Sequence, residues 1–580
     1  MRFNVKDSKQ FSRLTGAVTR SRKRMESHRE MRMKIIRQIV GKNYGECGSD
    51  LEMPINLMEL AINIYMQHLC SANPMPSVST KSMNLKPEAL QIELDLTNLV
   101  KEIDLRVALR ACVFEAMTGL GVMKVGVSFP ADVRPERNRW SGQPFADAVL
   151  LDDLLIDMGA TTPNNTLYVG DQYRMVVDDV RENESFDKEA REAVKGDDLN
   201  EARDGTPMAR DITSGEAEER DDLYDRCTIR DLWIPSEKIV ITYAVGGTKP
   251  LRVIDWKGPY CGPYHFLAFE EIPGNVMPLP PTYLWYDMNR IANNLYRKMD
   301  RQAERQKDLV AARGVAMEDA QRVQNSSDGE IFRTDDPGGV NEISFGGPSG
   351  KNMAFHVMNK DTFVYMAGNL DTIGGLSAQS PTLGQDRMLA AAASQRLAAL
   401  QDRVVEFTKS VMESLAWYRW SDPFLDTTVI KQVGGMDIPS RLTSYDRKGR
   451  FMDYNFDIQP YSLRGQTPQE KLQTLTMTWD KFIAPYIPFL QASGGNIDFD
   501  ALLRKVAQYT NNADLPEIYK SGAPQPEQET QQPPVSKPAF TERKTVRENR
   551  GTATRAGKDQ NFVSTMMGAD LQPAEKAMIF

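Results

Sequence analysis

The chain of 580 residues is longer than one hydrophobic core usually organises, so we expect about three or four domain-sized units. Its hydrophobic content of 41% is ordinary for a globular protein, and no apolar run approaches the roughly 20 residues of a membrane-spanning helix. A net charge of -8 and a pI near 5.4 exclude a protein that grips nucleic acid over a large basic surface.

The first 42 residues are basic and contain few acids. No apolar core follows the early basic residues, so the segment lacks the pattern of a signal peptide. From Met31 a helical pattern runs to Gly41. We interpret the basic side chains as a solvated helix face, with contact to DNA or to an acidic neighbour as the alternative. These side chains are Arg20, Arg22, Lys23, Arg24, Arg29, Arg32, Lys34 and Arg37.

Helical and strand patterns alternate up to residue 256. Leu57–His68 and Leu94–Met117 have helical spacing of apolar residues. Residues 178–225 are crowded with acids and hold few large apolar side chains, which predicts an exposed, partly disordered insertion. Residues 1–281 therefore form one predicted α+β unit. Its predicted strands are Val122–Val127, Leu167–Val177, Cys227–Trp233, Lys238–Ala244 and Leu251–Trp256, the last two joined by Gly246-Gly247 as a hairpin.

Two helices are predicted on either side of a short polar segment, residues 311–350. The first runs from Thr282 to about Val310, and the polar segment contains a strand-like run, Gly329–Arg333. The second helix is Asp361–Ile373, with Asp361 as a predicted N-cap. The narrow apolar stripe of the first helix favours packing against a neighbouring helix over burial in a core. The stripe consists of Leu284, Met288, Ile291, Leu295 and Met299.

A flexible and nearly uncharged segment of thirteen residues, Gly374–Asp386, follows the second helix. Behind it, Arg387–Trp420 is the longest predicted helix. From Gly522 onward the composition is that of a disordered tail. Between them, strands are predicted at Thr428–Val433 and Phe451–Ile458, and amphipathic helices at Pro468–Tyr486 and Asp500–Tyr509.

The sequence lacks the motifs of enzymes and metal sites. Its five cysteines and four histidines have neither CxxC nor metal-ligand spacing, so we expect no metal and no cofactor. Gly347–Asn352 approaches a phosphate-binding loop, but Phe345 stands where the first glycine belongs and Asn352 where the metal-binding hydroxyl belongs. We therefore expect no enzymatic activity.

The order and length of these segments resemble the portal protein family of tailed bacteriophages over about residues 30–520. Asn56–Leu60 through Pro76-Ser77-Val78 is similar to the early wing helix of that family and its trailing P-x-V stretch. Gly119–Gly126 is similar to the glycine turn and strand that follow, and Gly465–Lys471 to the opening of the crown.

This resemblance implies an α+β portal fold, with an α/β wing, a helical stem, a small α/β clip and a helical crown, assembled as a ring. The implied parts are the wing (1–281), the first stem helix (282–310), the clip (311–350), the second stem helix (351–373), the tunnel loop (374–386), the long wing helix with returning wing strands (387–465), the crown (466–521) and a C-terminal tail (522–580).

The resemblance also implies a function: a ring, typically of twelve subunits, that forms the channel for packaging, retention and ejection of double-stranded DNA. The ring would sit at one capsid vertex of the virion after assembly in the host cytoplasm. Its implied partners are the large terminase subunit, the major capsid and scaffold proteins, and the head–tail adaptor, with no membrane involved.

Two groups of residues are candidates for contact with DNA. The polar tunnel loop can make transient hydrogen bonds to phosphates, through Gly374, Gly375, Ser377, Gln379, Ser380, Thr382 and Gln385. Arg301, Arg305 and Lys307 can place sparse positive rings in the bore. In the alternative interpretation, these three cations pair with Asp300, Glu304 and Asp308 of neighbouring stems.

Two other classes of protein stay open at this point. One is a different virion structural protein, such as a head–tail adaptor or a minor capsid protein, although such chains are usually much shorter. The other is a packaging enzyme such as the large terminase, or a nuclease, which would need the phosphate-binding loop that this sequence lacks.

Overall fold

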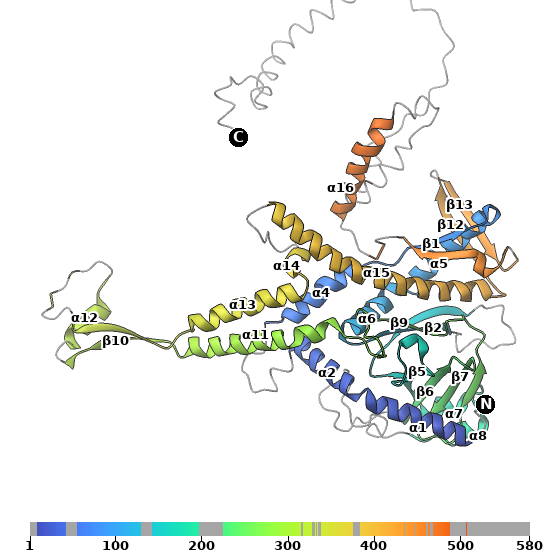
Figure 1. The fold of residues 1–580 in the computed structure, drawn as a ribbon, viewed down its shortest axis with the longest axis horizontal. Helices are drawn as coiled ribbons and strands as arrows, with labels where there is room; N and C mark the ends of the chain where they lie inside the picture. Colours follow the sequence, from blue (N-terminus) through green and yellow to red (C-terminus); the bar gives the residue numbers. More distant parts are fainter. Residues whose placement is uncertain are drawn as a thin grey trace, which may run out of the picture. The chain divides into compact units, whose positions relative to one another are not determined.

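The computed structural model of the protein is a mixed α+β fold whose strands form several small sheets (Figure 1). The chain divides into two compact units, Met1–Thr474 and Leu475–Phe580, and the elements below belong to the first unless stated otherwise. Every helix among the described residues is too short or too polar to span a membrane. The structure describes residues 8–41, 55–128, 142–196, 224–314, 317–327, 331, 333–334, 338–374, 383–433, 436–445, 447–459, 462–463, 468–487 and 506.

Two antiparallel sheets share a cluster of buried apolar residues. Three predicted strands are confirmed here: Val122–Val127, Leu167–Val177 and Cys227–Trp233. The predicted hairpin around Gly246-Gly247 is also present. The larger sheet has the order β4 (Leu154–Ile156), β5 (Val169–Val176), β6 (Arg226–Ile234), β7 (Ile239–Ala244) and β8 (Arg252–Asp255), and the smaller has β3 (Gln143–Val149), β2 (Gly121–Ser128) and β9 (Tyr264–Leu267).

The main core lies among four helices, two of which pack against the smaller sheet. The prediction of a single helix over Leu94–Met117 is wrong. The backbone of Asp104 has a φ of 43°, in the left-handed region, and this residue separates two helices. The predicted helix Leu57–His68 is confirmed. The four helices are α4 (Leu57–Leu69), α5 (Lys86–Glu102), α6 (Leu105–Thr118) and α15 (Leu383–Ser421).

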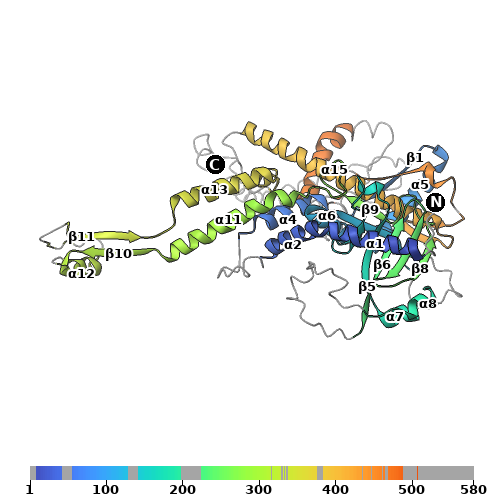
Figure 2. The ribbon, with the colours of Figure 1, turned by 60° about the horizontal axis from the view of Figure 1, so that its bottom comes forward.

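Helices α11 (Pro281–Glu304) and α13 (Gly350–Met366) lie side by side as a hairpin (Figure 2). The hairpin continues into an antiparallel ribbon of β10 (Lys307–Ala312) and β11 (Val340–Phe345). The short helix α12 (Met317–Asn325) packs on β10.

Three sequence predictions fail in this hairpin. The helix predicted to reach Val310 ends at Glu304, because the chain is already a strand from Lys307. Ile331 and Arg333 of the predicted strand Gly329–Arg333 belong to no strand, and β11 pairs with β10 instead. The second helix starts at Gly350, so Asp361 lies inside it and is not an N-cap; a separate short helix, α14 (Leu370–Ile373), follows.

The acidic insertion predicted for residues 178–225 is partly wrong. Val180 of α7 (Val177–Glu182), Ala190 of α8 (Lys188–Glu192) and Phe186 between these helices are buried against strands of the larger sheet. These few apolar residues are spaced along an otherwise acidic segment, and they are enough to dock it. Residues 197–223 lie outside the described part of the chain.

Segments distant in sequence meet where β1 (Pro76–Thr80) pairs with β14 (Tyr454–Ile458). The strand predicted at Thr428–Val433 is confirmed as β12 (Asp426–Val433), which pairs with β13 (Met436–Thr443). The helix predicted from Pro468 is α16 (Pro468–Thr478); a π-helical turn, Trp479–Ile483, and a 3-10 turn, Ala484–Tyr486, follow in the second unit. Of the helix predicted at Asp500–Tyr509, only Val506 is described, and the tail from Gly522 lies outside the described residues.

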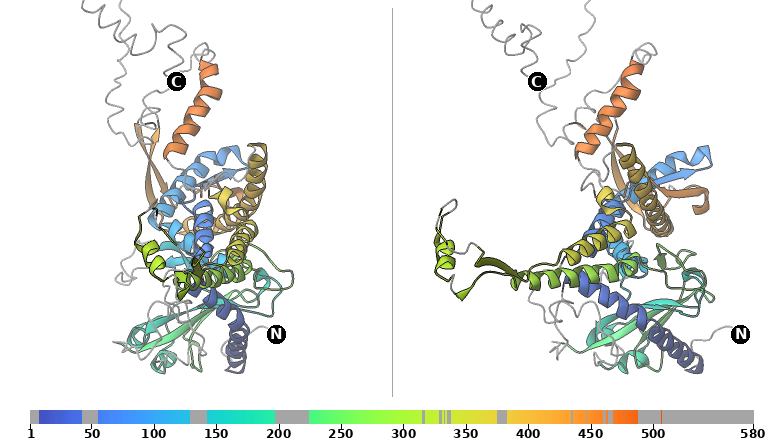
Figure 3. Two further views of the ribbon diagram at one scale, coloured as in Figure 1. Left: turned by 90° about the vertical axis from the view of Figure 1, so that its left-hand side faces the viewer. Right: turned by 60° about the vertical axis from the view of Figure 1, so that its left-hand side comes forward.

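The basic N-terminus forms two helices, α1 (Ser8–Arg24) and α2 (Glu26–Val40), that lie against the sheets and the helical core (Figure 3). The interpretation of its basic side chains as a solvated face is wrong for Arg22, Arg29 and Arg32, each at most 3% exposed. Arg22 donates a hydrogen bond to the side-chain oxygen of Gln172, and Arg32 contacts two carboxylates of distant segments.

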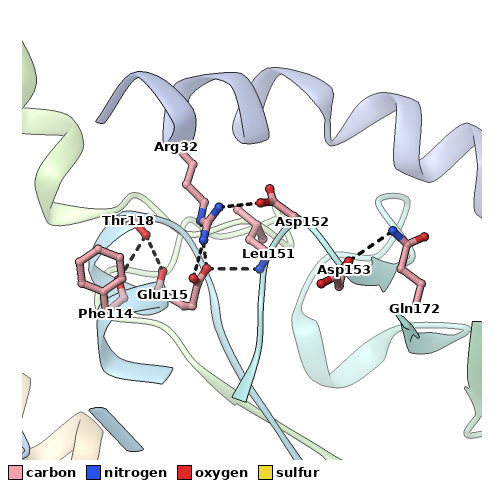
Figure 4. Close-up of polar contacts among 8 residues, drawn as sticks. All are labelled: Arg32, Phe114, Glu115, Thr118, Leu151, Asp152, Asp153 and Gln172. Carbon is pink, nitrogen blue, oxygen red and sulfur yellow. Dashed lines mark hydrogen bonds and ion pairs between the residues drawn. The ribbon is translucent and has the colours of Figure 1, made fainter. Parts of the chain in front are cut away.

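Arg32 has two buried carboxylate partners (Figure 4). Its Nε lies 3.0 Å from Glu115 Oε2 of α6, and its Nη1 lies 3.0 Å from Asp152 Oδ2 in the turn before β4. Glu115 also accepts a hydrogen bond from the backbone nitrogen of Leu151. Burial raises the pKa of Glu115, and the charge of Arg32 opposes that rise. One guanidinium thus joins α2, α6 and the turn before β4.

We expect Arg32→Met to lower the free energy of unfolding by about 3–5 kcal/mol, because two buried carboxylates lose their counter-charge. Without the guanidinium, Glu115 in the folded protein holds its proton to a higher pH than in the unfolded chain. The deficit is therefore smallest at acidic pH and grows as the pH rises from the ordinary carboxylate pKa through the raised folded pKa of Glu115.

Chemical denaturation at several pH values measures this deficit. The matched control is Arg290→Met, since the pair of Arg290 with Asp287 at 3.0 Å is exposed and contributes at most about 1 kcal/mol. Equal, pH-independent effects of the two substitutions would contradict the assignment.

Candidate functional site

The α11–α13 hairpin is fixed at its base by an aromatic cluster. Trp285 of α11 is 1% exposed, and its ring centroid lies 5.8 Å from Tyr65 of α4 and 6.2 Å from Phe363 of α13. The Tyr65 hydroxyl donates a hydrogen bond of 2.6 Å to the carbonyl of Ala367, just after α13. One residue of α4 thus contacts both arms of the hairpin.

The buried face of α11 is largely polar. Asn289 donates to Gln38 Oε1 at 2.9 Å and accepts from the backbone nitrogen of Leu57 at 3.2 Å. Asn293 donates to the carbonyl of Ile55 at 2.9 Å. These hydrogen bonds set the axial position of the helix, because sliding α11 would leave buried polar groups without partners.

The apolar stripe predicted on α11 is half-buried. Leu284 and Met288 pack against the edge of the core, and Ile291, Leu295 and Met299 are only half-buried. None of the five stripe residues is fully buried, but two of them contact the core, so the prediction that the stripe is not a core face is confirmed only in part.

Apolar side chains are also exposed on α13. A helix that carries this much apolar surface outward is typical of a contact surface rather than of a solvent-facing one. The exposed residues are Met353 (61%), Phe355 (49%), Val357 (49%), Met358 (64%) and Tyr365 (72%), with Tyr296 of α11 (44%) nearby in the hairpin.

The basic candidates gather at the far end of the hairpin. Arg301 is in the last turn of α11, Arg305 directly follows the helix, and Lys307 is the first residue of β10 instead of a helical residue as predicted. All three are exposed, and none forms an ion pair with a carboxylate within the described part of the chain. The Gln302 side chain holds the start of α13 beside them by accepting from the backbone nitrogen of Ser349 at 3.1 Å.

The predicted loop Gly374–Asp386 is shorter than expected, because α15 begins at Leu383 and includes Gln385. Gly374 is exposed, and its backbone nitrogen donates to the carbonyl of Leu370 at 2.7 Å. The other candidate residues of the loop lie outside the described residues. They are Gly375, Ser377, Gln379, Ser380 and Thr382.

The segment before this loop and the middle of α15 both contact α4. His68 Nε2 lies 3.2 Å from the carbonyl of Ile373, and the His68 carbonyl accepts from Gln401 of α15 at 3.1 Å. Before the loop, Gly368 has a φ of 86°, and a Cβ there would lie 2.8 Å from the Tyr65 hydroxyl. The loop thus starts from a segment that α4 holds in place.

The structure does not bring the loop and the basic residues together. They lie at opposite ends of α13, whose seventeen residues span about 25 Å. Within the described residues no group of three or more His, Cys, Asp or Glu side chains is arranged to hold a metal ion.

No model of a known protein family matches this sequence, and no curated protein matches it significantly. The argument about function therefore depends on the residues of the hairpin and the loop.

Sequence reasoning missed the residues that position this site. Tyr65 and His68 sit one turn apart on α4 and looked like ordinary members of an amphipathic helix. Asn289 and Asn293 gave a usable signal, since two amides four residues apart lie on one face of a helix and point to a buried polar contact.

We expect Tyr65→Phe to lower the free energy of unfolding by about 1 kcal/mol, because only the hydrogen bond to Ala367 is lost. Tyr65→Ala also removes the ring beside Trp285 and is expected to cost about 3–5 kcal/mol. Chemical denaturation measures both, and hydrogen exchange should be faster at Ile373 and Gly374 in the alanine variant.

Tyr260→Phe is the control, since Tyr260 is 91% exposed and its change should leave stability unaltered. If Tyr65→Ala behaves like this control, α4 does not hold the hairpin.

Proposed function

We propose that this chain is a portal-type subunit, copies of which assemble side by side into a ring around a channel for double-stranded DNA. The observation that carries the proposal is the α11–α13 hairpin, whose two helices keep apolar side chains exposed in the single chain. A second copy placed against this surface would remove it from water.

The two exposed faces of the hairpin are different, which favours a ring over a symmetric dimer. On α11 the exposed apolar residues are Tyr283 and Tyr296, whereas on α13 they include Met353 and Val357. Contact between unlike faces of neighbouring copies is heterologous, and a heterologous contact that closes on itself produces a ring.

The β10–β11 ribbon supports the same conclusion. A two-stranded ribbon is marginally stable in water when it stands alone. This ribbon has only the short α12 packed on it among the described elements. Neighbouring copies in a ring would supply the missing contacts.

The charge pattern fits a channel along which DNA slides. Each copy adds a net charge of -8, so the assembly as a whole repels phosphate. Arg301, Arg305 and Lys307 would then form sparse positive rings near the ribbon, and the loop after Gly374 would offer uncharged hydrogen-bonding groups at the other end of α13.

The proposal includes the partners that such a ring needs at a capsid vertex: the large terminase subunit, the major capsid and scaffold proteins and the head–tail adaptor. It includes twelve subunits as the typical number, a place in the virion, and no enzymatic activity. A minor capsid or adaptor protein is the second candidate.

We expect the purified protein to sediment as one large closed oligomer and Met358→Glu to shift it toward monomers, because the change buries a charge in the contact between hairpins. Met83→Glu makes the same change at a residue 75% exposed outside the hairpin and should leave the oligomer intact. Analytical ultracentrifugation measures the masses. A wild-type protein that stays monomeric over the accessible concentration range would contradict the proposal.

Replacing residues 375–382 by a four-residue Gly/Ser linker should leave the oligomer intact while packaging or retention of DNA fails, since the shortened loop no longer reaches into the channel. A Gly/Ser linker of the full eight residues is the control that separates length from chemistry. The measurement is the amount of nuclease-protected DNA in assembled particles. Normal packaging by the short-linker variant would show that the loop has no role in the channel.

A further inference from the structure

A cleft of about 800 Å³ opens between the two sheets and α15, away from the hairpin and the loop. Its wall comes from the end of β6, the segment between β8 and β9, and one face of α15. This volume is in the range of ligand-binding sites, which is roughly 300–1,000 Å³. The proposed channel function makes no use of it.

The cleft is lined by several aromatic side chains that are held in place. The indole of Trp233 packs on Gly262, whose φ is 86° and where a Cβ would lie only 2.4 Å from the ring. The indole nitrogen of Trp256 donates to the carbonyl of Pro259 at 2.7 Å, which fixes the second ring. Phe407 and Trp417 of α15 complete the lining. The apolar surface is thus organised without a ligand.

Two polar nitrogen atoms of the lining residues lack a hydrogen-bond partner in the described part of the chain. His265 is 4% exposed; its Nδ1 lies 2.8 Å from the hydroxyl of Ser410, whereas its Nε2 has no partner. The Nε1 of Trp233 has none either. Burial lowers the pKa of His265 to about 4, so the ring is neutral near pH 7. When Ser410 donates to Nδ1, both free nitrogens carry a hydrogen and are donors.

The charged residues of the cleft cancel one another. Lys238 and Arg403 face Glu271 and Glu406, so two positive groups stand against two negative ones. The ammonium of Lys238 lies 5.3 Å from the ring centre of Tyr260 at the rim. A nucleic-acid strand would need an excess of positive charge. A ligand without net charge fits better.

We propose that this cleft binds an extended, uncharged, proline-containing segment of a partner protein. Such a segment has no internal hydrogen bonds, so its carbonyl oxygens are free to accept from the donors of Trp233 and His265. Its pyrrolidine rings pack on aromatic faces such as those of Trp256 and Trp417. The proposal does not depend on ring assembly.

The probe is a fluorescein-labelled peptide of repeated Pro-Pro-Leu, and its control has Gly in place of each Pro. We expect saturable binding of the proline peptide to the wild-type protein by fluorescence anisotropy. Trp233→Phe should weaken binding about fivefold to tenfold, because the variant keeps a six-membered aromatic ring but loses the indole N–H donor. The control is Tyr445→Phe, which removes an exposed hydroxyl donor outside the cleft and should bind normally.

A second measurement uses the unsubstituted protein. Cys261 lines the cleft and is exposed, whereas Cys70, Cys112 and Cys227 are buried, so bound peptide should slow alkylation of Cys261. Peptide mapping by mass spectrometry follows this residue alone.

Three outcomes would overturn the proposal. In the first, the proline and glycine peptides bind equally or neither binds. In the second, an oligothymidine strand binds and protects Cys261 instead. In the third, Cys261 is unreactive in the oligomer without peptide but reactive in the Met358→Glu monomer, which would assign the cleft to a second copy of the chain.

Discussion

The contact of Tyr65 with both arms of the α11–α13 hairpin is the constraint on which the proposed site depends. Its ring stacks on Trp285, and its hydroxyl holds the carbonyl of Ala367. Three residues further along α4, His68 contacts Ile373, just before the loop, and Gln401 in the middle of α15. Because a single buried helix holds all of these parts, the hairpin and the loop keep a fixed relation to the core and can present the same surface in every copy of the chain.

The same principle explains why the N-terminal arginines are buried. Arg32 links three elements through charge-assisted hydrogen bonds to Glu115 and Asp152. An isolated buried carboxylate would be costly, and so would an isolated guanidinium, so the arrangement is stable only when all three meet. Such a network specifies one docking position for α2. Gln38 of α2 also accepts a hydrogen bond from Asn289 of α11. Because the buried charges fix α2, they help to fix the position of the hairpin as well.

Local patterns predicted the strands with clean alternation, such as β2, and the turn at Gly246-Gly247. Local patterns failed where contacts with residues distant in sequence determine burial or the end of a helix. Arg32 lies 83 residues from Glu115 and 120 from Asp152, so nothing near Arg32 indicated burial. Apolar spacing continued across Asp104 although the helix does not. At the site, the sequence predicted that the α11 stripe is not fully buried. The role of Asn289 could not be predicted without its partners, which are distant in sequence. Most of the predicted loop lies outside the described residues.

The central claim is that identical hairpins close into a ring around a channel. Electron microscopy of the purified protein in negative stain, viewed end-on, tests it most directly. The account predicts annular particles of one size, with a central hole wide enough for duplex DNA and regular subunit density around it. Compact particles without a hole, or open filaments built from the same contact, would contradict it.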